Sequence, residues 1–321
     1  MAADSDLIIV SRSREAYSPY IDTRRAFRET PPQLDFVWPG FYAGTVGILV
    51  GSGGSGKSFL ALELAMAVSG GQRADLLRLE PTSRGKVIYL CLEDPHAILL
   101  HRMHAVGQRF DEETQDAVAD RFFARPAAGK LLDLLDSKHS AALMRECEGV
   151  RLLIIDTLRR AHSGDENSNS EMAKLLGVCE RVCSRTGVSI LLVHHTRKGG
   201  AGDGGEAQHA ARGASALVDN ARWGACLDRM SEHDAETHAD QDRSTDPLLP
   251  LRIHERRGFY AKLSYPKPNY GEPRPDSWLR REKGGVLVPA RLEYMPAAAK
   301  SGDGAARKRA EATWRGRPGR E

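Results

Sequence analysis

The sequence predicts an α/β fold in which a mainly parallel sheet is extended by antiparallel strands. Between Val46 and Val193, short apolar runs alternate with segments of helical periodicity. This alternation is typical of parallel strands joined by crossover helices. The runs are apolar throughout, as expected for strands that are buried on both faces of a sheet. After Ala214, strand-like segments follow one another with short turns, which indicates antiparallel pairing.

The apolar runs and periodic segments give the expected order of elements. Strands are expected at Val46–Val50, Val87–Leu92, Phe122–Ala124, Leu152–Ile155 and Val188–Val193. Helices are expected at Lys57–Ser69, Pro95–Val106, Ser137–Cys147 and Ser170–Arg185. Strands of the antiparallel extension are expected at Trp223–Leu227, Leu251–Glu255, Tyr260–Ser264, Trp278–Arg281 and Val286–Leu292.

Length and composition indicate a cytoplasmic globular protein. The chain has 321 residues, of which 41% are hydrophobic, and a net charge of +3. No apolar run is long enough for a membrane span, and the first residues lack the pattern of a secretory signal. The five cysteines form no C-x-x-C pair, which favours free thiols in a reducing compartment.

Composition also predicts three regions: a lead-in at residues 1–44, a central domain at 45–295 and a tail at 296–321. The tail is basic and poor in apolar residues, so we expect disorder. It serves either as an arm for an acidic partner or as a solubilising tail. The aromatic residues between Phe36 and Tyr42 either stack on a base or pack against the domain. The polar stretch Met230–Pro250 is expected to be a mobile loop.

The most informative motif is the glycine-rich stretch between the first predicted strand and helix. It reads GSGGSGKS and has the spacing G-x-x-x-x-G-K-S of the phosphate-binding loop of nucleoside triphosphatases. Its backbone N–H groups are expected to surround phosphate oxygens, with Lys57 adding a charge and Ser58 a hydroxyl for Mg²⁺. The expected nucleotide-binding residues are Gly51, Gly53, Gly54, Ser55, Gly56, Lys57, Ser58 and Phe59.

Acidic residues end two other predicted strands. Asp156 closes the run RLLIID and is expected to bind Mg²⁺ together with Ser58. Glu93 and Asp94 follow the run VIYLCL. Ligands in open parallel sheets lie beyond the carboxyl ends of the strands, so Glu93 is placed to activate water. Asp94 is expected to cap the helix that begins at Pro95.

The last predicted parallel strand ends in His194 and His195, and a long glycine-rich segment follows. A side chain at this strand end can sense a terminal phosphate and relay its presence to the segment. Adjacent strand residues point to opposite faces, which argues against one metal ion bound by both histidines. Arg197, Lys198 and Arg212 are the expected contacts to a nucleic-acid backbone; an unstructured surface loop is the alternative.

Together these motifs resemble the RecA-type hexameric ATPases, and within them the RepA-type replicative DNA helicases of broad-host-range plasmids. The resemblance runs from about Leu34 to Tyr294. Its most specific stretches are AGTVGILVGSGGSGKS, VIYLCLEDP, HRMHAVG, LLIIDTLRRAH, HHTRKG, RGASALVDNARW and PNYG. It implies that residues 45–295 form a RecA-like ATPase domain. The lead-in and the basic tail have no clear counterpart in the family, and we expect the lead-in to contact a neighbouring subunit.

The resemblance also implies roles for single residues. Lys57, Ser58 and Asp156 would hold ATP and Mg²⁺, and Glu93 would be the catalytic base. His195 matches the γ-phosphate sensor. Arg222 matches the arginine finger offered to the neighbouring subunit's nucleotide, and the glycine-rich segment matches the DNA-gripping loop of a central channel.

The function expected from this resemblance is ATP-dependent DNA unwinding in plasmid-type replication. A hexameric ring would move along single-stranded DNA, with initiator and primase activities supplied by other proteins. One alternative is a non-translocating RecA-like DNA-binding ATPase with a regulatory or recombinase-like role. A small-molecule kinase with the same phosphate loop is a further alternative, and it would need a substrate pocket and a lid.

Overall fold

The computed structural model describes residues 20–130, 132–166, 168–195, 215–241, 253–270 and 274–294. The chain divides into two units, residues 1–34 and residues 35–321. Within the described part of the first unit, helix α1 (Thr23–Arg28) is capped by the Asp22 carboxylate and buries none of its residues. None of the helices in the described ranges combines the length and the apolar character that a membrane crossing requires.

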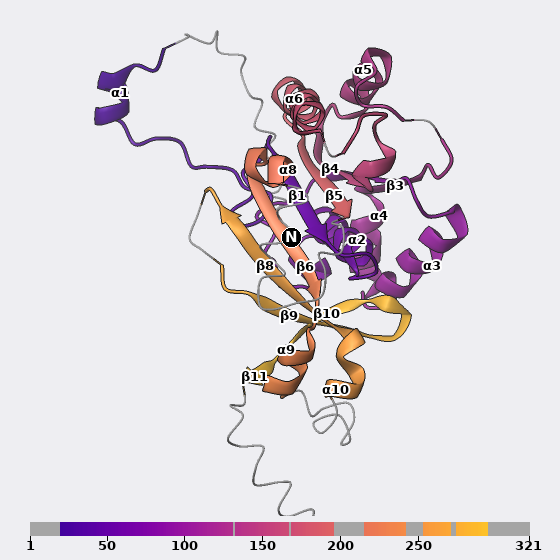
Figure 1. The fold of residues 1–321 in the computed structure, drawn as a ribbon. Helices are drawn as coiled ribbons and strands as arrows, with labels where there is room; N and C mark the ends of the chain where they lie inside the picture. The colour runs from indigo at the N-terminus through magenta and orange to yellow at the C-terminus, as the bar shows by residue number, and fades with distance from the viewer. Residues whose placement is uncertain are drawn as a thin grey trace, which may run out of the picture. The chain divides into compact units, whose positions relative to one another are not determined.

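A nine-stranded sheet forms the centre of the second unit (Figure 1). The strand order is β10-β9-β8-β6-β1-β5-β4-β2-β3. The strands are β1 (Val46–Gly51), β2 (Lys86–Cys91), β3 (Phe122–Pro126), β4 (Val150–Asp156), β5 (Ser189–His195), β6 (Trp223–Arg229), β8 (Tyr260–Pro268), β9 (Ser277–Arg281) and β10 (Leu287–Ala290). Strands β3, β2, β4, β5, β1 and β6 pair in parallel, and β8, β9 and β10 pair antiparallel. The predicted fold class is confirmed.

Helices cover both faces of the parallel strands because successive strand residues alternate between two cores. Leu49 packs in the core under α2, α3 and α4, whereas Ile48 and Val50 pack in the core under α5, α6 and α8. The helices are α2 (Lys57–Gly70), α3 (His96–Gly107), α4 (Glu112–Ala119), α5 (Ser137–Glu146), α6 (Asn169–Thr186) and α8 (Ser215–Asn220). Short 3₁₀ turns are η1 (Gln72–Ala74), η2 (Leu158–Arg160), η4 (Arg257–Phe259) and η5 (Lys283–Gly285).

The boundary between the parallel and antiparallel parts lies later than expected. Strand β6 was expected to belong to the antiparallel extension, but it runs parallel to β1, with Gly47 opposite Trp223. The extension therefore begins at β8. The expected strand at Leu251–Glu255 is wrong in its described part, where α10 (Ile253–Arg256) is helical. Ile253 is buried in a small third core, so its apolar side chain reflects one buried position of a short helix and not a strand.

The polar stretch expected to be a mobile loop is ordered in its first half. Helix α9 (Glu232–Thr237) begins with a capping box in which Ser231 and Asp234 bond each other's backbone N–H groups. Strand β7 (His238–Asp240) then pairs with β11 (Leu292–Tyr294). The buried Asp240 carboxylate accepts hydrogen bonds from Tyr260 and Arg280. This polar network, rather than apolar periodicity, holds the segment in place.

The aromatic residues before β1 belong to the core. Trp38 and Phe41 are buried, and Phe41 stacks on Trp223 of β6 with ring centroids 5.5 Å apart. The packing interpretation is therefore confirmed over base stacking for these two rings. Cys179 and Cys183 on α6 are buried in the core that also holds Ile48 and Val50.

Candidate active site

The sheet gathers most of the predicted site residues at one edge. Strands β1, β5, β4 and β2 are consecutive neighbours, and their carboxyl ends lie together because the strands are parallel. Gly51 at the end of β1 is opposite His195 at the end of β5, and Asp156 at the end of β4 is opposite Cys91. Glu93 follows β2 by two residues. Four motifs far apart in the sequence therefore meet at the start of α2.

The loop between β1 and α2 has the backbone that a phosphate cradle requires. Gly54 and Gly56 adopt positive φ angles of 71° and 112°, which L-residues with a Cβ rarely adopt. A Cβ at Gly54 would overlap the Arg229 guanidinium. The hydroxyl of Ser55 is buried without a hydrogen-bond partner in the described residues. Gly53 has open space beside its backbone, and the buried Ser55 hydroxyl of the same loop is free to donate, so these residues fit a phosphate group.

Lys57 is the first residue of α2 and is buried. Its Nζ donates to the carbonyl oxygens of Gly51 and Ser52 at 2.7 and 2.8 Å. Burial lowers the pKa of Lys57 from 10.5 to about 8, and Asp156 is the strongest of the acidic groups that oppose this shift. A lysine held in this state gains charge when an anion binds, which matches its expected contact with phosphate.

Asp156 and Ser58 are the residues that would hold Mg²⁺. Asp156 is buried, and its Oδ2 accepts a hydrogen bond from Tyr89 at 2.5 Å. Burial raises the pKa of Asp156, while the hydroxyls of Tyr89 and Ser58 oppose the shift. Ser58 lies nearby, yet no hydrogen bond of normal geometry links the two side chains, and Asp156 Oδ1 has no partner in the described part of the chain. A buried, half-satisfied carboxylate beside a hydroxyl fits a hard cation.

Glu93 and His195 lie in contact. Nε2 of His195 is 3.5 Å from Oε2 of Glu93. Both side chains are partly exposed, at 38% and 42%. A carboxylate that is accessible to solvent and oriented by an imidazole is able to accept a proton from water. In the sequence, His195 directly precedes the glycine-rich segment.

His194 points away from His195, as the alternation along a strand predicts. It is buried, and burial together with His195 and Lys57 lowers its pKa to about 4. Its Nδ1 lies 3.8 Å from Oε1 of Glu166, beyond hydrogen-bonding distance. His162 is also buried and interacts electrostatically with His194, and burial lowers the pKa of His162. Within the described ranges, no three His, Cys, Asp or Glu residues are arranged to hold a metal ion.

Asp94 does not cap the following helix as expected. The N-cap residue of α3 is Pro95, and no side chain caps it. Asp94 instead forms an ion pair with Arg102 of α3 at 2.5 Å, because two helical turns place Arg102 on the same face of α3 as its first residues. The Arg102 guanidinium lies 5.4 Å from the ring centre of Phe59. The Phe59 ring therefore contacts α3, and its contact with nucleotide stays a prediction.

Arg222 is the one described site residue that the fold places elsewhere. Its backbone N–H donates to the carbonyl of Val46, at the amino end of β1. The phosphate loop lies at the other end of β1, roughly 17 Å away at about 3.3 Å per strand residue. The Arg222 side chain is exposed. Arg222 therefore has no part in the site of its own chain. Arg197, Lys198 and Arg212 lie outside the described residues.

Three residues at the site were not predicted from the sequence. Tyr89 orients Asp156, and its alternation within β2 was a signal that it faces the phosphate-loop helix. Arg229 and Arg281 contact the loop from β6 and β9, with their Nη2 atoms 2.8 Å from Gly53 O and 3.2 Å from Gly54 O. No local pattern marks these arginines, because the contacts depend on the pairing of β6 with β1 and on where the antiparallel extension places β9.

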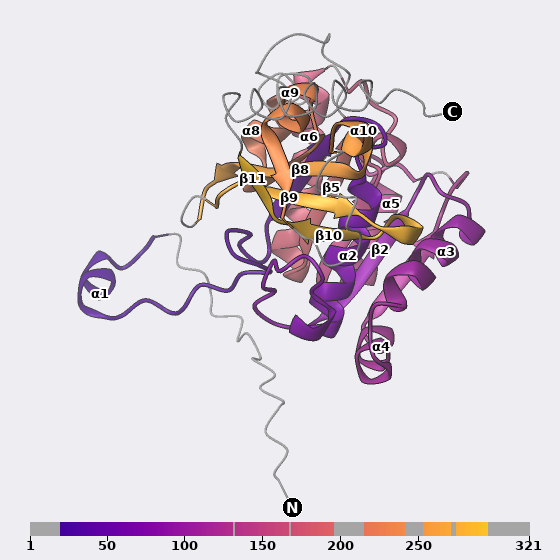
Figure 2. The same cartoon turned by 90° about the horizontal axis from the view of Figure 1, so that it is seen from below.

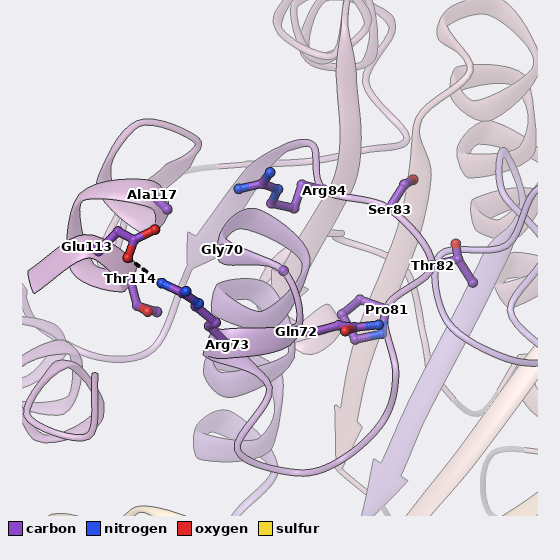
Figure 3. Close-up of a pocket in the computed structure, with 11 residues that line it drawn as sticks. Gly70, Gln72, Arg73, Pro81, Thr82, Ser83, Arg84, Glu113, Thr114 and Ala117 are labelled. Atoms are coloured by element: carbon purple, nitrogen blue, oxygen red, sulfur yellow. Dashed lines mark hydrogen bonds and ion pairs between the residues drawn. The ribbon is translucent and has the colours of Figure 1, made fainter. Parts of the chain in front are cut away.

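A cavity of about 490 Å³ lies away from this edge (Figure 3). It surrounds the carboxyl end of α2, and its lining includes Gly70, Arg73, Thr82, Arg84 and Glu113. Figure 3 shows the ion pair between Arg73 and Glu113 across it. The phosphate loop is at the opposite end of α2, and the carboxyl end of a helix dipole repels anions. The cavity is therefore separate from the candidate active site.

A family model described as an AAA domain matches residues 12–201, which is more than half of the chain. The crystal structure of the RadB recombinase aligns with a TM-score of 0.46 at 12% sequence identity. The alignment covers 76% of this chain and 90% of that chain.

Proposed function

The chain belongs to the AAA-domain family, and we propose that it is an ATP-dependent DNA helicase of the RepA type. In this proposal a ring of subunits, expected to be hexameric, hydrolyses ATP to move along single-stranded DNA during plasmid-type replication. The observation that carries it is the meeting of Lys57, Asp156 and the Glu93–His195 pair at one sheet edge, while Arg222 lies exposed at the other edge.

Five residues of one chain would support hydrolysis. Lys57 would bind the outer phosphates of ATP, and Ser58 with Asp156 would hold Mg²⁺, which neutralises charge on the phosphate oxygens when bound. Glu93 would accept the proton of the attacking water, and His195 would orient Glu93 at 3.5 Å. Burial of Lys57 and Asp156 strengthens their interactions with charge because the local dielectric constant is low.

Arg222 would complete the site of a neighbouring subunit. Its exposed side chain at the opposite edge suits a contact between subunits, and an arginine supplied in trans raises turnover by about a thousandfold or more. The lead-in at residues 1–44 would add a second subunit contact. Tyr20, Ile21 and Phe27 are more than four-fifths exposed, which favours burial against another chain.

The contact with DNA is proposed for the segment that follows His195. Arg197, Lys198 and Arg212 would bind the phosphate backbone without sequence preference, so affinity would fall with salt. The Glu93–His195 contact would connect this segment to the state of the nucleotide. Initiator and primase activities would come from partner proteins.

A strand-displacement assay on a forked duplex tests the proposal. The full-length protein with ATP and Mg²⁺ should displace one strand, and single-stranded DNA should stimulate its ATPase activity. The Glu93→Gln variant is the matched control: it should bind nucleotide and DNA but displace no strand. DNA-stimulated ATPase activity without displacement by the wild-type protein would leave the non-translocating DNA-binding ATPase. ATPase activity that does not respond to DNA would contradict both.

A further inference from the structure

The four carbonyl groups at the start of the phosphate loop are all bonded to cations. Lys57 Nζ binds the carbonyls of Gly51 and Ser52. Arg229 Nη2 binds the carbonyl of Gly53 at 2.8 Å, and Arg281 Nη2 binds that of Gly54 at 3.2 Å. The lysine comes from the loop's own helix, whereas the two arginines come from β6 and β9.

In the part of the chain that the structure describes, Arg229 and Arg281 show no ion pair that would explain their positions in another way. Neither forms an ion pair with a carboxylate of the described residues, and Nε of Arg281 is buried without a hydrogen-bond partner there. Two guanidinium groups close together repel each other, and burial together with Arg229 lowers the pKa of Arg281. The repulsion between the two guanidinium groups costs free energy, and their hydrogen bonds to the loop carbonyls offset this cost.

Cations on the carbonyls determine where the N–H groups point. In a trans peptide, the carbonyl of one residue and the N–H of the next point in opposite directions. Bonds to the carbonyls of Gly51, Ser52 and Gly53 therefore turn the N–H groups of residues 52 to 54 to the opposite side of the loop. Successive N–H groups on one side form an anion-binding concavity. Glycine residues restrict their backbone dihedral angles little, so the hydrogen bonds from the arginines fix the backbone conformation of the loop.

The extension is fixed to the loop by further contacts. A Cβ at Gly51 would overlap the carbonyl of Leu227 on β6, and a Cβ at Gly56 would lie 3.0 Å from Nη2 of Arg281. Leu287, which pairs with Arg281 across β9 and β10, donates its N–H to buried Glu63 of α2 at 2.8 Å. Figure 2 shows β10 beside α2, and the two elements are in contact. Strand β10 is therefore held against the helix that the loop begins, and β9 is paired with β10.

We propose that Arg229 and Arg281 are positioning residues, through which β6 and β9 hold the phosphate loop ready for a nucleoside di- or triphosphate. The inference extends the proposed function at the same site. Lys57 leaves the carbonyls of Gly51 and Ser52 when it turns to phosphate, whereas the arginines keep those of Gly53 and Gly54. The loop then keeps its shape through binding and release, and phosphate affinity depends on β6 and on β9 of the antiparallel extension.

The test compares Arg229→Met and Arg281→Met with Arg229→Lys and Arg281→Lys in the full-length protein. Methionine keeps the length of the side chain without a donor, and lysine keeps a cationic donor. Arg257→Met is the matched control, because Arg257 lies near the start of β8 and pairs with Glu232 at 2.8 Å without touching the loop. Amide hydrogen exchange of residues 51–60 is measured without nucleotide. Calorimetry then gives the Kd for Mg-ADP and for a non-hydrolysable Mg-ATP analogue.

Each methionine variant should exchange its loop amides faster and bind both nucleotides about 10-fold more weakly, the loss expected for one charged hydrogen bond. The lysine variants should recover most of the affinity, and Arg257→Met should match the wild type. Unchanged exchange and Kd would overturn the inference. A lower Tm with an unchanged Kd would also overturn it. A loss of affinity for the ATP analogue alone would overturn it too, because the arginines would then contact the terminal phosphate. Failure of the wild type to bind nucleotide would contradict the proposed function, and the exchange comparison would still decide the inference.

Discussion

Replacing Glu63 by glutamine should remove a pH-dependent loss of stability. Glu63 lies in the middle of α2 with 1% of its surface exposed. Its Oε1 accepts the Leu287 N–H at 2.8 Å, and its Oε2 has no partner among the described residues. The substitution Glu63→Gln keeps the acceptor and the size of the side chain but cannot ionise. It therefore isolates the cost of a buried carboxylate.

The magnitude follows from the pKa. Burial raises the pKa of Glu63 from 4.5 to about 8, more than the Leu287 hydrogen bond and Arg109 lower it. Between these two values the folded state holds one proton more than the unfolded state, so the free energy of unfolding falls as pH rises. At about 1.4 kcal/mol per pH unit, the wild type loses on the order of 4–5 kcal/mol across this window. Below the window the carboxyl is neutral in both states, and above it the loss is complete.

Urea denaturation of both proteins between about pH 5 and pH 9 measures the effect, because the difference between them cancels the titration of all other groups. Glu63→Gln should gain stability over the wild type steadily as pH rises, and level off above about pH 8. Glu113→Gln is the control, since Glu113 is exposed and its variant should track the wild type within about 1 kcal/mol. A difference between Glu63→Gln and the wild type that stays constant with pH would refute the assignment of a buried, protonated carboxyl.

Three further predictions concern the candidate active site. Nucleotide binding should take up a proton and weaken as pH rises past about 8, because phosphate favours the charged form of Lys57; calorimetry in buffers of different ionisation enthalpy measures this, and a constant affinity would contradict it. Arg222→Ala should bind nucleotide normally and lose turnover by about a thousandfold, and mixing it with Glu93→Gln subunits should restore part of the activity; no recovery at any ratio would argue against a finger in trans. Tyr89→Phe should raise the Mg²⁺ concentration required for ATPase activity about 10-fold, because Asp156 loses the hydroxyl that orients it; an unchanged Mg²⁺ titration would show that Tyr89 has no such role.

Local patterns were sufficient to predict the parallel part of the fold. Strands such as Leu152–Ile155 are apolar throughout and are observed within one or two residues of the expected bounds, as β4 shows. The residues that end these strands were also predictable, because parallel strands must bring their carboxyl ends together. Lys57, Glu93, Asp156 and His195 consequently lie where the sequence places them.

Strand β6 and the antiparallel extension were harder to predict because their contacts are long-range. The strand at Trp223 looks the same in sequence whether it runs parallel or antiparallel to its neighbour, and only the pairing with Gly47 decides. The helix at Ile253 has a single apolar anchor, too few for a period. Arg229 and Arg281 contact residues more than 170 positions away, and no spacing in the sequence encodes such a contact.

The position of Arg222 has a consequence for how the proposed ATPase can work. A charge roughly 17 Å from the phosphate loop, on an exposed side chain, acts across about two screening lengths at physiological salt. Its influence on a nucleotide in its own chain is therefore small, whereas Arg229 and Arg281 touch the loop directly. An effect of Arg222 on hydrolysis requires a second subunit that brings this edge of the sheet against the loop of its neighbour. Arg229 and Arg281 would then hold the phosphate loop within each chain, and the neighbouring subunit would complete the site with its Arg222.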